Sequence, residues 1–243
     1  MKCCFIIPCY NHDLVIHETV SALKKFSFPI IIIDDGSQTS TKEILQKIAQ
    51  EFEQVELIQH VQNGGKGAAM QTGLAAAIEK NMTHALQIDA DGQHDLNDLQ
   101  AFLLKAKQHP KALISGKPVY DDTISKGRFY GRYITHFWVA LETLSFKVID
   151  SMCGYRVYPL AEYQKLIRSA HLGKRMDFDI EVMVKLIWQG VDVHFVDTKV
   201  HYPEFGLSHF HAFKDNVLIS KMHTRLFFGM LYRLPTLLLR KLR

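Results

Sequence analysis

Cysteine is scarce in this chain of 243 residues, and its four cysteines do not form sequence pairs. Cys3, Cys4 and Cys9 share one short apolar segment, whereas Cys153 stands alone. This spacing excludes a small disulfide-linked scaffold and a zinc site built from two CxxC pairs. The thirteen histidines also lack zinc-type spacing with acidic or cysteine partners. We therefore expect reduced thiols and a cytoplasmic protein.

Long hydrophobic runs are also missing. A membrane-spanning helix needs roughly 20 apolar residues in succession, and Arg233, Pro235 and Arg240 interrupt the apolar C-terminal region. The segment from Cys3 to Cys9 contains Pro8 and is too short for the hydrophobic core of a signal peptide. With 47% apolar and 22% charged residues, the composition is that of a globular chain, not of a disordered, coiled-coil or multi-span protein.

The usual glycine signatures of nucleotide-binding folds are absent as well. Gly65-x-Gly67 is followed by Met70 and comes after the third expected strand, so it does not match the dinucleotide-binding pattern, and there is no GxxxxGK[ST] loop. The first expected strand ends in PCYN instead of the G-x-G-[TS]-R-like loop typical of nucleotidyltransferases. The string NGGKGAA at residues 63–69 still opens a helix of small residues. Such a helix N-terminus attracts anions, and Lys66 is placed to approach a phosphate or a sugar.

Positive charge is concentrated at the C-terminus. The net charge is +4, but residues 211–243 alone carry +6, which leaves −2 for the rest of the chain. Leucine and phenylalanine stand beside these cations in an amphipathic pattern that is typical of a helix lying in an anionic membrane interface. The alternative is a terminal helix that packs on its own domain or on a partner chain. We expect a peripheral protein on the inner face of the membrane, with no nucleic-acid partner.

Short β-branched runs alternate with helical patterns through most of the chain. The expected strands are residues 3–7, 30–34, 55–60, 84–89, 112–115 and 191–197. The expected helices are residues 15–25, 41–53, 68–80, 96–107 and 128–147. This order predicts an α/β fold with a mainly parallel sheet flanked by helices, in which ligands bind at the carboxyl ends of strands. We interpret residues 1–210 as one domain, with a nucleotide-binding half at about 1–116, an acceptor half at about 117–210 and an amphipathic helical tail at 211–243.

Two carboxylates, Asp89 and Asp91, follow the fourth expected strand in the string IDADGQH. The backbone turns as the strand ends, which lets both acids face one cation. Mg²⁺ and Mn²⁺ take oxygen ligands and keep positions open for phosphate oxygens. We therefore predict Asp89, Asp91 and Gln93 as metal ligands, with a nucleotide diphosphate supplying further oxygens. The alternative is a turn or helix-capping cluster, which the position at the end of a parallel strand disfavours.

A second acidic group follows the second expected strand, where an isoleucine run ends in DDGS at residues 34–37. Asp35 is well placed to accept a hydrogen bond from a base N–H or a ribose hydroxyl, and Gly36 permits close approach. A capped β-to-α turn explains these residues equally well.

Taken together, the strings CFIIPCYNH, IIIDDGS, NGGKGAA and LQIDADGQHD, in this order and spacing, resemble family 2 glycosyltransferases of the GT-A fold. The resemblance covers about residues 3–210 and is closest to the dolichyl- and polyprenyl-phosphate sugar transferases. Residues 150–156 (DSMCGYR) and 178–181 (FDIE) are similar to two further motifs of that family. The resemblance implies a Rossmann-like nucleotide-sugar-binding fold. It also implies inverting transfer from a UDP-, GDP- or dTDP-sugar to a lipid-linked or hydroxyl acceptor, dependent on Mg²⁺ or Mn²⁺.

The resemblance also implies roles for single residues. The nucleoside would be held by Pro8, Tyr10 and Asp35. The metal and the diphosphate would be held by Asp89, Asp91 and Gln93. Lys117, Lys199 and His209 would be cations near phosphate, and Lys66 and Ala90 are further expected substrate contacts. Helical spacing places Arg128 one turn from Arg132, where it meets either an anionic acceptor or only solvent. The chain departs from the family at His12, which replaces an acid, and at Lys117, which replaces the bidentate fork of arginine with a point charge.

Inverting transfer needs a nucleophile behind the anomeric carbon and neutralisation of the leaving diphosphate, the latter being the task of the metal held by Asp91. A hydroxyl acceptor also needs a base, and the resemblance points to Asp179, with Asp177 behind it. A helix N-terminal acid favoured by the helix dipole is an alternative of comparable weight. Asp179 and Glu181 are two apart in a helical pattern, so only one is expected to face the cleft. An ionised lipid phosphate would need no base.

The competing functions are a nucleotide-sugar-binding protein without transfer activity and a nucleotidyltransferase.

Overall fold

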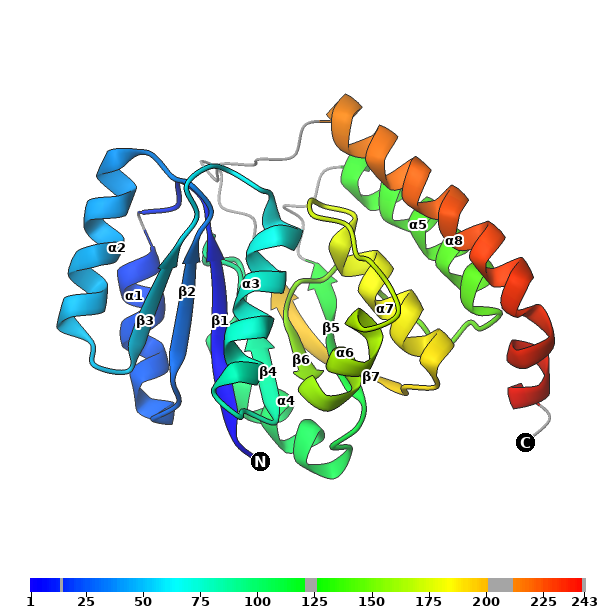
Figure 1. The fold of residues 1–243 in the computed structure, drawn as a ribbon, viewed down its shortest axis with the longest axis horizontal. Helices are drawn as coiled ribbons and strands as arrows, with labels where there is room; N and C mark the ends of the chain where they lie inside the picture. Colours follow the sequence, from blue (N-terminus) through cyan, green and yellow to red (C-terminus); the bar gives the residue numbers. More distant parts are fainter. Residues whose placement is uncertain (14, 121–125, 201–211, 242–243) are drawn as a thin grey trace.

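A seven-stranded sheet runs through the part of the chain that the computed structural model describes, residues 1–13, 15–120, 126–200 and 212–241. The strand order is β3-β2-β1-β4-β6-β5-β7. Helices lie on both sides of the sheet, and the long C-terminal helix lies beyond the β5–β7 end (Figure 1). The predicted α/β class with a mainly parallel sheet is confirmed.

The sheet is parallel except at one strand. The strands are β1 (Cys3–Cys9), β2 (Ile30–Asp34), β3 (Val55–Gln59), β4 (His84–Gln87), β5 (Leu113–Tyr120), β6 (Arg156–Pro159) and β7 (Val193–Val200). Strand β1 pairs in parallel with β2 and β4, β2 pairs in parallel with β3, and β5 pairs in parallel with β7. Strand β6 is antiparallel to both of its neighbours, β4 and β5.

The helices form layers on the two faces of the sheet. They are α1 (Ile16–Leu23), α2 (Thr39–Glu51), α3 (Lys66–Glu79), α4 (Leu99–Gln108), α5 (Lys126–Thr143), α6 (Leu160–Ile167), α7 (Phe178–Gln189) and α8 (Ala212–Lys241). Two 3-10 segments, η1 (Lys24–Phe26) and η2 (Leu96–Asp98), continue α1 and precede α4.

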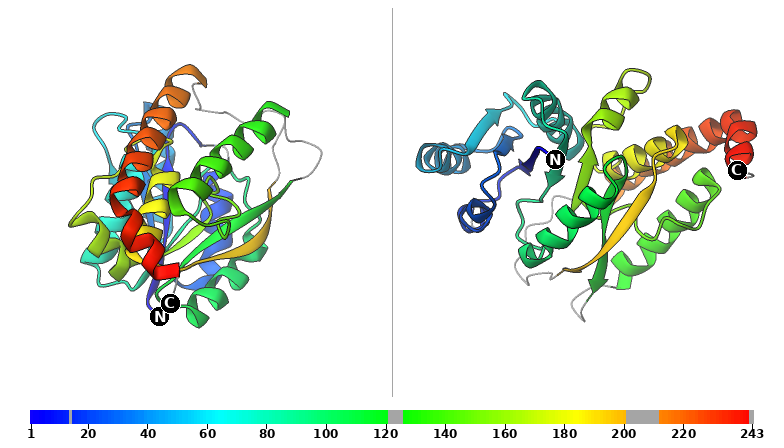
Figure 2. Two further views of the ribbon diagram at one scale, coloured as in Figure 1. Left: turned by 90° about the vertical axis from the view of Figure 1, so that its right-hand side faces the viewer. Right: turned by 90° about the horizontal axis from the view of Figure 1, so that it is seen from below.

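Alternating side chains of the central strands build two hydrophobic cores. In β1, Cys4 and Ile6 join one core, whereas Phe5 and Ile7 join the other, as the two-residue period of a strand requires. Helices α3, α6, α7 and α8 contribute to the first core, and α1, α2 and α4 contribute to the second (Figure 2). Because both faces are covered, β1 and β2 are buried along nearly their whole length.

Several elements differ from those predicted. The strand expected at 112–115 continues as β5 to Tyr120 because it pairs with β7 along its whole length. Strand β6 is missing from the prediction, since it is only four residues long and begins with an arginine. Helix α8 passes through Pro235 without a break. Burial of Met230 and Leu237 on either side of this proline offsets the hydrogen bond that it removes.

The predicted boundary near residue 116 falls inside β5. The sheet continues without a break from β3 to β7, so both proposed halves of the domain share it. The division into a nucleotide-binding half and an acceptor half stays a prediction about function.

Polar loops gather at one edge of the sheet. The parallel strands β1, β2 and β4 end there, followed by Tyr10, Asp35 and Asp89. Strand β6 runs in the opposite direction, and its first residue, Arg156, is in register with Gln87 near the end of β4. The loop that enters β6 therefore reaches the same edge as the loops that leave the parallel strands.

Helix α8 packs along α5 and α7 (Figures 1 and 2). Met222, Leu226 and Met230 are buried in this contact, and His223 Nδ1 lies 2.8 Å from the buried Glu142 Oε1 of α5. This packing agrees with the alternative of a terminal helix that packs on its own domain, and it leaves another side of the helix exposed. Within the described residues, every helix is too short or too polar to cross a membrane.

Candidate active site

Asp89 lies just beyond the carboxyl end of β4 and contacts three side chains. Lys66 Nζ donates a hydrogen bond to Asp89 Oδ2 at 2.9 Å, and Gln87 Nε2 donates to Oδ1 at 3.1 Å. His94 Nε2 is 3.6 Å from Oδ2. Burial alone raises the pKa of Asp89, but the Lys66 ammonium and His94 outweigh it and hold the pKa well below its ordinary value. Asp89 is therefore an anion at neutral pH.

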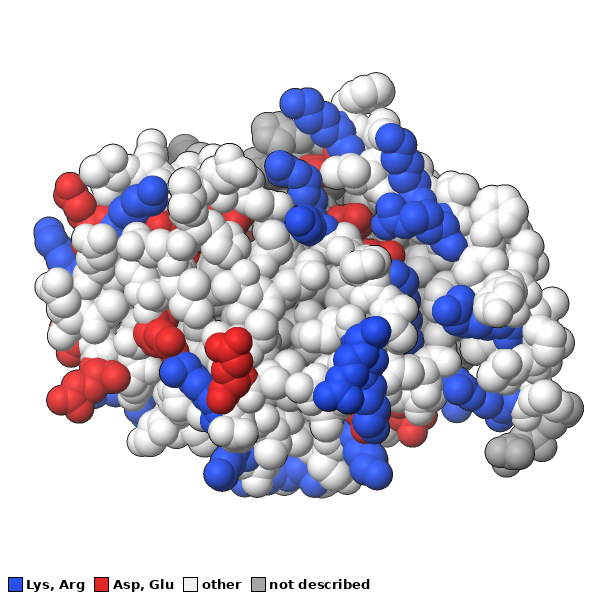
Figure 3. Space-filling model, viewed as in Figure 1, with Lys and Arg blue, Asp and Glu red and all other residues white. Residues whose placement is uncertain are grey.

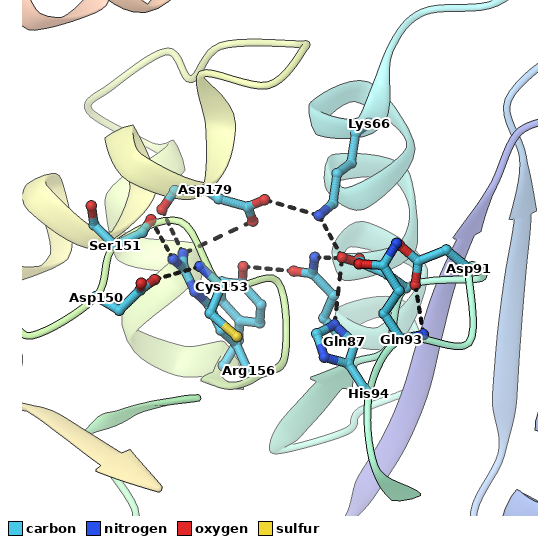
Figure 4. A network of polar contacts seen from close by, with 12 residues as sticks. Lys66, Gln87, Asp91, Gln93, His94, Asp150, Ser151, Cys153, Arg156 and Asp179 are labelled. Atoms are coloured by element: carbon cyan, nitrogen blue, oxygen red, sulfur yellow. Dashed lines mark hydrogen bonds and ion pairs between the residues drawn. The ribbon is translucent and has the colours of Figure 1, made fainter. Parts of the chain in front are cut away.

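Lys66 joins Asp89 to an acid from the second half of the chain. Figure 4 shows Lys66 and this acid, Asp179, pointing toward one another. Lys66 Nζ is 3.1 Å from Asp179 Oδ2 in the first turn of α7. Burial lowers the pKa of Lys66, but Asp179 and Asp89 together raise it above its ordinary value and keep the ammonium charged. In this structure Lys66 pairs with two carboxylates of the protein itself, and its contact with a phosphate or a sugar stays a prediction.

The two acids in the first turn of α7, Asp179 and Glu181, contact different partners. Asp179 faces Lys66, whereas Glu181 accepts a hydrogen bond from the backbone N–H of Gly173 at 2.6 Å and pairs with Lys185 at 2.8 Å. The prediction that only one of the two acids faces the site is confirmed. The role of Asp179 as a base stays a prediction.

Asp177 lies just before α7. One of its carboxylate oxygens accepts a hydrogen bond from the backbone N–H of Arg175 at 3.1 Å. Its other oxygen is 4.0 Å from the guanidinium of Arg225 on α8. Asp177 therefore contributes to the loop before α7 and its contact with α8.

A buried arginine holds the beginning of α7. The Arg156 side chain is fully buried and donates hydrogen bonds to the backbone carbonyls of Asp179 and Ser151. Its Nη1 is also 3.9 Å from Asp179 Oδ1. In the same strand, the Tyr158 hydroxyl donates to Gln87 Oε1 at 2.9 Å, and this bond orients the Gln87 amide toward Asp89. Strand β6 thus supports both acids of the site.

Sequence reasoning missed Gln87, Tyr158 and Gly154. An amide inside an apolar strand, between Leu86 and Ile88, is a signal that could have revealed Gln87. Gly154 stands in the DSMCGYR motif, but only the structure shows its neighbours. A Cβ atom at this glycine would collide with the Asp89 carboxylate and would lie 2.7 Å from Lys66 Nζ.

Asp35 holds the glycine loop that carries Lys66. Its two carboxylate oxygens accept hydrogen bonds from the backbone N–H groups of Gly64 at 2.9 Å and Gly65 at 2.7 Å. His60 Nδ1 is 2.7 Å from Oδ1, and Asp35 is only 2% exposed. Gly65 has a φ of 98°, which favours glycine at this turn. Asp35 therefore shapes the loop, and its contact with a nucleoside stays a prediction.

The N-terminus of α3 is covered, contrary to our expectation of an open anion site. The backbone N–H of Ala68 donates to the Lys174 carbonyl at 2.9 Å. A Cβ atom at Gly67 would lie 2.6 Å from the Gly173 carbonyl oxygen, so this loop fits closely against the helix. The covering loop is remote in sequence, and the local pattern of residues 63–69 cannot reveal it.

The predicted metal ligands lie on the turn after β4. Asp91 Oδ1 accepts a hydrogen bond from the Gln93 backbone N–H at 3.1 Å, and Ala90 is buried between the two aspartates. In the part of the chain that the structure describes, no three His, Cys, Asp or Glu side chains converge to hold a metal ion. The metal role of Asp89, Asp91 and Gln93 stays a prediction.

The remaining predicted substrate residues are more dispersed. Pro8 lies in β1 opposite Ile33, and Tyr10 is half-buried just beyond that strand. Lys117 on β5 pairs with Asp197 on β7 at 3.0 Å, and Lys199 is exposed on β7. The side chain of Arg128 and the whole of His209 lie outside the described residues.

The sheet and its loops have the GT-A fold, and solved structures are similar to it. Glucosyl-3-phosphoglycerate synthase from Mycobacterium tuberculosis, in complex with Mn²⁺, uridine diphosphate and phosphoglyceric acid, matches with a TM-score of 0.68 and 14% identity, over 94% of this chain and 78% of that one. S. aureus TarS 1-349 in complex with UDP-GlcNAc matches with a TM-score of 0.64 and 16% identity, over 93% and 66%.

The model of glycosyl transferase family 2 matches residues 4–164, and the chain belongs to this family. Dolichyl-phosphate beta-glucosyltransferase of Dictyostelium discoideum is 26% identical over 244 residues, which cover 92% of this chain and 73% of that protein. UDP-N-acetylglucosamine–dolichyl-phosphate N-acetylglucosaminyltransferase of Methanococcus voltae is 26% identical over 219 residues, which cover 84% and 87%. Family membership sets the nucleotidyltransferase interpretation aside.

Proposed function

We propose that this glycosyltransferase moves a sugar, with inversion, from a nucleoside diphosphate sugar to a lipid phosphate. The observation that carries the proposal is the bridge from Asp89 through Lys66 to Asp179, which joins the end of β4 to the start of α7. It supports the proposal because it brings a cation and two carboxylates together beyond the carboxyl end of a parallel strand, where folds of this kind bind their ligands. Relatives named as dolichyl-phosphate sugar transferases support the choice of a lipid phosphate.

Asp89, Asp91 and Gln93 would hold Mg²⁺ or Mn²⁺. These residues offer oxygen donors, which suit hard divalent cations. The structure also places a cation, the Lys66 ammonium, against Asp89, so the surroundings of this carboxylate accommodate positive charge. The ion would neutralise charge on the leaving diphosphate when bound. The Mn²⁺ and uridine diphosphate in the related synthase structure support this assignment.

The side chains of this protein would position the two substrates. Pro8, Tyr10 and the loop held by Asp35 would receive the nucleoside, and Lys66 would meet the diphosphate. A lipid phosphate is already ionised, so its oxygen attacks without a base. If the acceptor were a hydroxyl, Asp179 would take its proton, since this carboxylate reaches the site from the acceptor side.

Helices α5 and α8 offer a surface for the membrane that such an acceptor requires. Trp138 of α5 contacts Phe227 of α8, with ring centroids 6.2 Å apart, so the two helices adjoin through aromatic side chains. Large apolar side chains around this contact are exposed on both helices: Tyr133, Ile134, Phe137, Val217, Phe228, Leu231 and Tyr232. An exposed apolar surface with aromatic residues is typical of interfacial membrane binding.

Basic side chains accompany this apolar surface. Lys214, Lys221, Arg225 and Arg233 are exposed on α8, and Lys and Arg side chains gather over the α7–α8 half of the face in Figure 3. Cations beside an apolar helix face attract anionic lipid headgroups. We infer a peripheral enzyme whose α5–α8 surface contacts the inner face of the membrane.

The function is tested by transfer assays with UDP-, GDP- and dTDP-sugars, Mn²⁺, and a short polyprenyl phosphate or the matching alcohol. We expect one donor to yield a product with the phosphate acceptor and an inverted anomeric centre by NMR. Asp91→Asn should lower the transfer rate at least about a hundredfold, equivalent to about 2.7 kcal/mol, because it removes a ligand charge opposite the diphosphate.

Asp192→Asn provides the control, because Asp192 is an exposed acid before β7 and makes the same charge change. Full turnover by Asp91→Asn would refute the metal assignment. Nucleotide-sugar binding without transfer to either acceptor would favour a binding protein, and transfer to the alcohol alone would refute the lipid phosphate.

A further inference from the structure

We propose that Lys66 is a displaceable counter-cation. It ties Asp89 to Asp179 before the donor binds, and it exchanges these carboxylates for the donor diphosphate, which leaves Asp89 free to hold the metal. Asp179 is thereby released for the acceptor only after the donor has arrived. This inference rests on the proposed function and adds an order of events to it.

The charges in the site alternate along one chain of contacts. Asp89 and Asp179 lie 2.9 and 3.1 Å from the same ammonium, and the Arg156 guanidinium lies 3.9 Å beyond Asp179. Asp179 Oδ1 is buried and accepts no hydrogen bond among the described residues. Without a ligand, Lys66 therefore provides the closest positive charge to both acids, and an Asp89 bound to Lys66 is less attractive to a divalent ion.

Lys66 can move, whereas its two partners are held in place. Gln87 donates to the other oxygen of Asp89 and is itself held by the Tyr158 hydroxyl, and Arg156 holds the backbone carbonyl of Asp179. Lys66 is the first residue of α3, next to a glycine turn, and its ammonium is carried on a flexible four-carbon stem. A small reorientation of this stem is enough to change its partner.

Gly154 makes room for this arrangement. A Cβ atom there would collide with Asp89, and it would lie 2.7 Å from Lys66 Nζ and 2.8 Å from Gln87 Nε2. Gly154 thus lets the polar ends of three side chains converge beside the loop that precedes β6. This convergence brings the lysine to the carboxylate that we assign to the metal.

The test measures Mn²⁺ affinity by electron paramagnetic resonance, using the full chain with and without uridine diphosphate. The wild type should bind Mn²⁺ weakly alone and far more tightly with the nucleotide. Lys66→Met should bind Mn²⁺ alone at least tenfold more tightly than the wild type, because Asp89 loses its competing cation. The same variant should bind uridine diphosphate more weakly in the presence of Mn²⁺, because the diphosphate loses Lys66.

Lys80→Met is the matched control, because Lys80 is an exposed lysine at the other end of α3 and pairs with Glu56 on β3. It should leave both affinities unchanged. A second variant, Lys66→Met with Asp179→Asn, keeps the net charge of the site and should also bind Mn²⁺ alone more tightly. This double variant tests the displaceable lysine if the single variant fails to fold.

The outcomes separate this inference from the proposed function. Failure of the wild type to bind uridine, guanosine or thymidine diphosphate with Mn²⁺ would overturn both. Normal binding by the wild type, with nucleotide-free Mn²⁺ affinity in the folded Lys66 variants no higher than in the wild type, would overturn the displaceable lysine alone.

Discussion

At the scale of single residues, Asp35 combines a structural and an expected functional role. Its carboxylate holds Gly64 and Gly65, and through them the loop that carries Lys66. A nucleoside at the end of β2 would meet this loop as well as the acid beneath it. Both roles of Asp35 therefore affect the same quantity, the affinity for nucleotide.

We expect Asp35→Ala to weaken nucleotide binding by about 1–3 kcal/mol, the range for loss of a charged hydrogen-bonding partner. Isothermal titration calorimetry with uridine diphosphate measures this directly. Asp34→Ala is the control, because the neighbouring acid is equally buried but bonds to Ser37 and Gln59 instead of the glycine loop. Unchanged affinity in the folded Asp35 variant would remove this residue from the nucleotide site.

The sequence identifies the acids of the site better than it identifies their partners. Asp89 follows a strand, so a local rule is enough to single it out, whereas Asp179 is singled out by the resemblance of FDIE to a family motif. The link through Lys66 depends on how three remote segments converge, which no local spacing encodes. Gly154 escapes for the same reason, since its importance arises from neighbours in other segments.

At the scale of elements, Asp150 fastens α5 to the loop that enters β6. Its Oδ1 accepts hydrogen bonds from the backbone N–H groups of Met152 and Cys153, and Arg132 of α5 reaches Oδ2 at 2.6 Å. Burial alone raises the pKa of Asp150, but His136 and Arg132 outweigh it and lower the pKa to about 2. The ionised form is thus favoured by folding.

A lowered pKa contributes stability above the unfolded pKa of about 4, and this contribution is lost as the pH falls toward about 2. We expect Asp150→Asn to lower the free energy of unfolding by about 2 kcal/mol at pH 7. The difference from the wild type should shrink between pH 4 and pH 2. Urea unfolding at several pH values measures it, with Asp192→Asn as a surface control. A difference in the free energy of unfolding between Asp150→Asn and the wild type that is the same at every pH would contradict the stabilising role of the ionised Asp150.

The elements also show where sequence patterns stop being informative. The parallel strands β1 and β2 are long isoleucine-rich runs and are predictable, because burial on both faces demands apolar side chains throughout. Strand β6 is short and contains Arg156, whose burial is possible only because carbonyls of other segments accept its hydrogen bonds. The pairing of β6 depends on neighbouring strands from other parts of the chain, so its own sequence does not reveal it.

At the scale of the whole molecule, the α5–α8 surface predicts binding to anionic vesicles. Phe137→Ser combined with Phe228→Ser should weaken vesicle binding at least tenfold, because both side chains are mostly exposed and would insert into the interface. Binding by the wild type should weaken with salt without vanishing. Cosedimentation with anionic liposomes measures both effects.

Val61→Ser is the matched control, since Val61 is 98% exposed but lies near the end of β3, on the nucleotide side. Binding that is unchanged in the double variant would show that this surface does not meet lipid. Point substitutions are preferable to removal of α8, because Met222, Leu226 and Met230 are buried against the body. Truncation would expose the apolar surface that they cover and so confuse unfolding with loss of membrane contact.

The glycine before β6 also limits how this enzyme can diverge. A methyl group at Gly154 would push apart three side chains that come from two other segments, so no single compensating change restores them. Gly131 on α5 is the opposite case, with open space where a Cβ atom would stand. Substitution is therefore sterically open at Gly131, in the half of the chain that we propose for the acceptor, and closed at Gly154, beside the acids that we propose for the donor. We expect descendants of this protein to vary more readily in α5 than in the loop before β6.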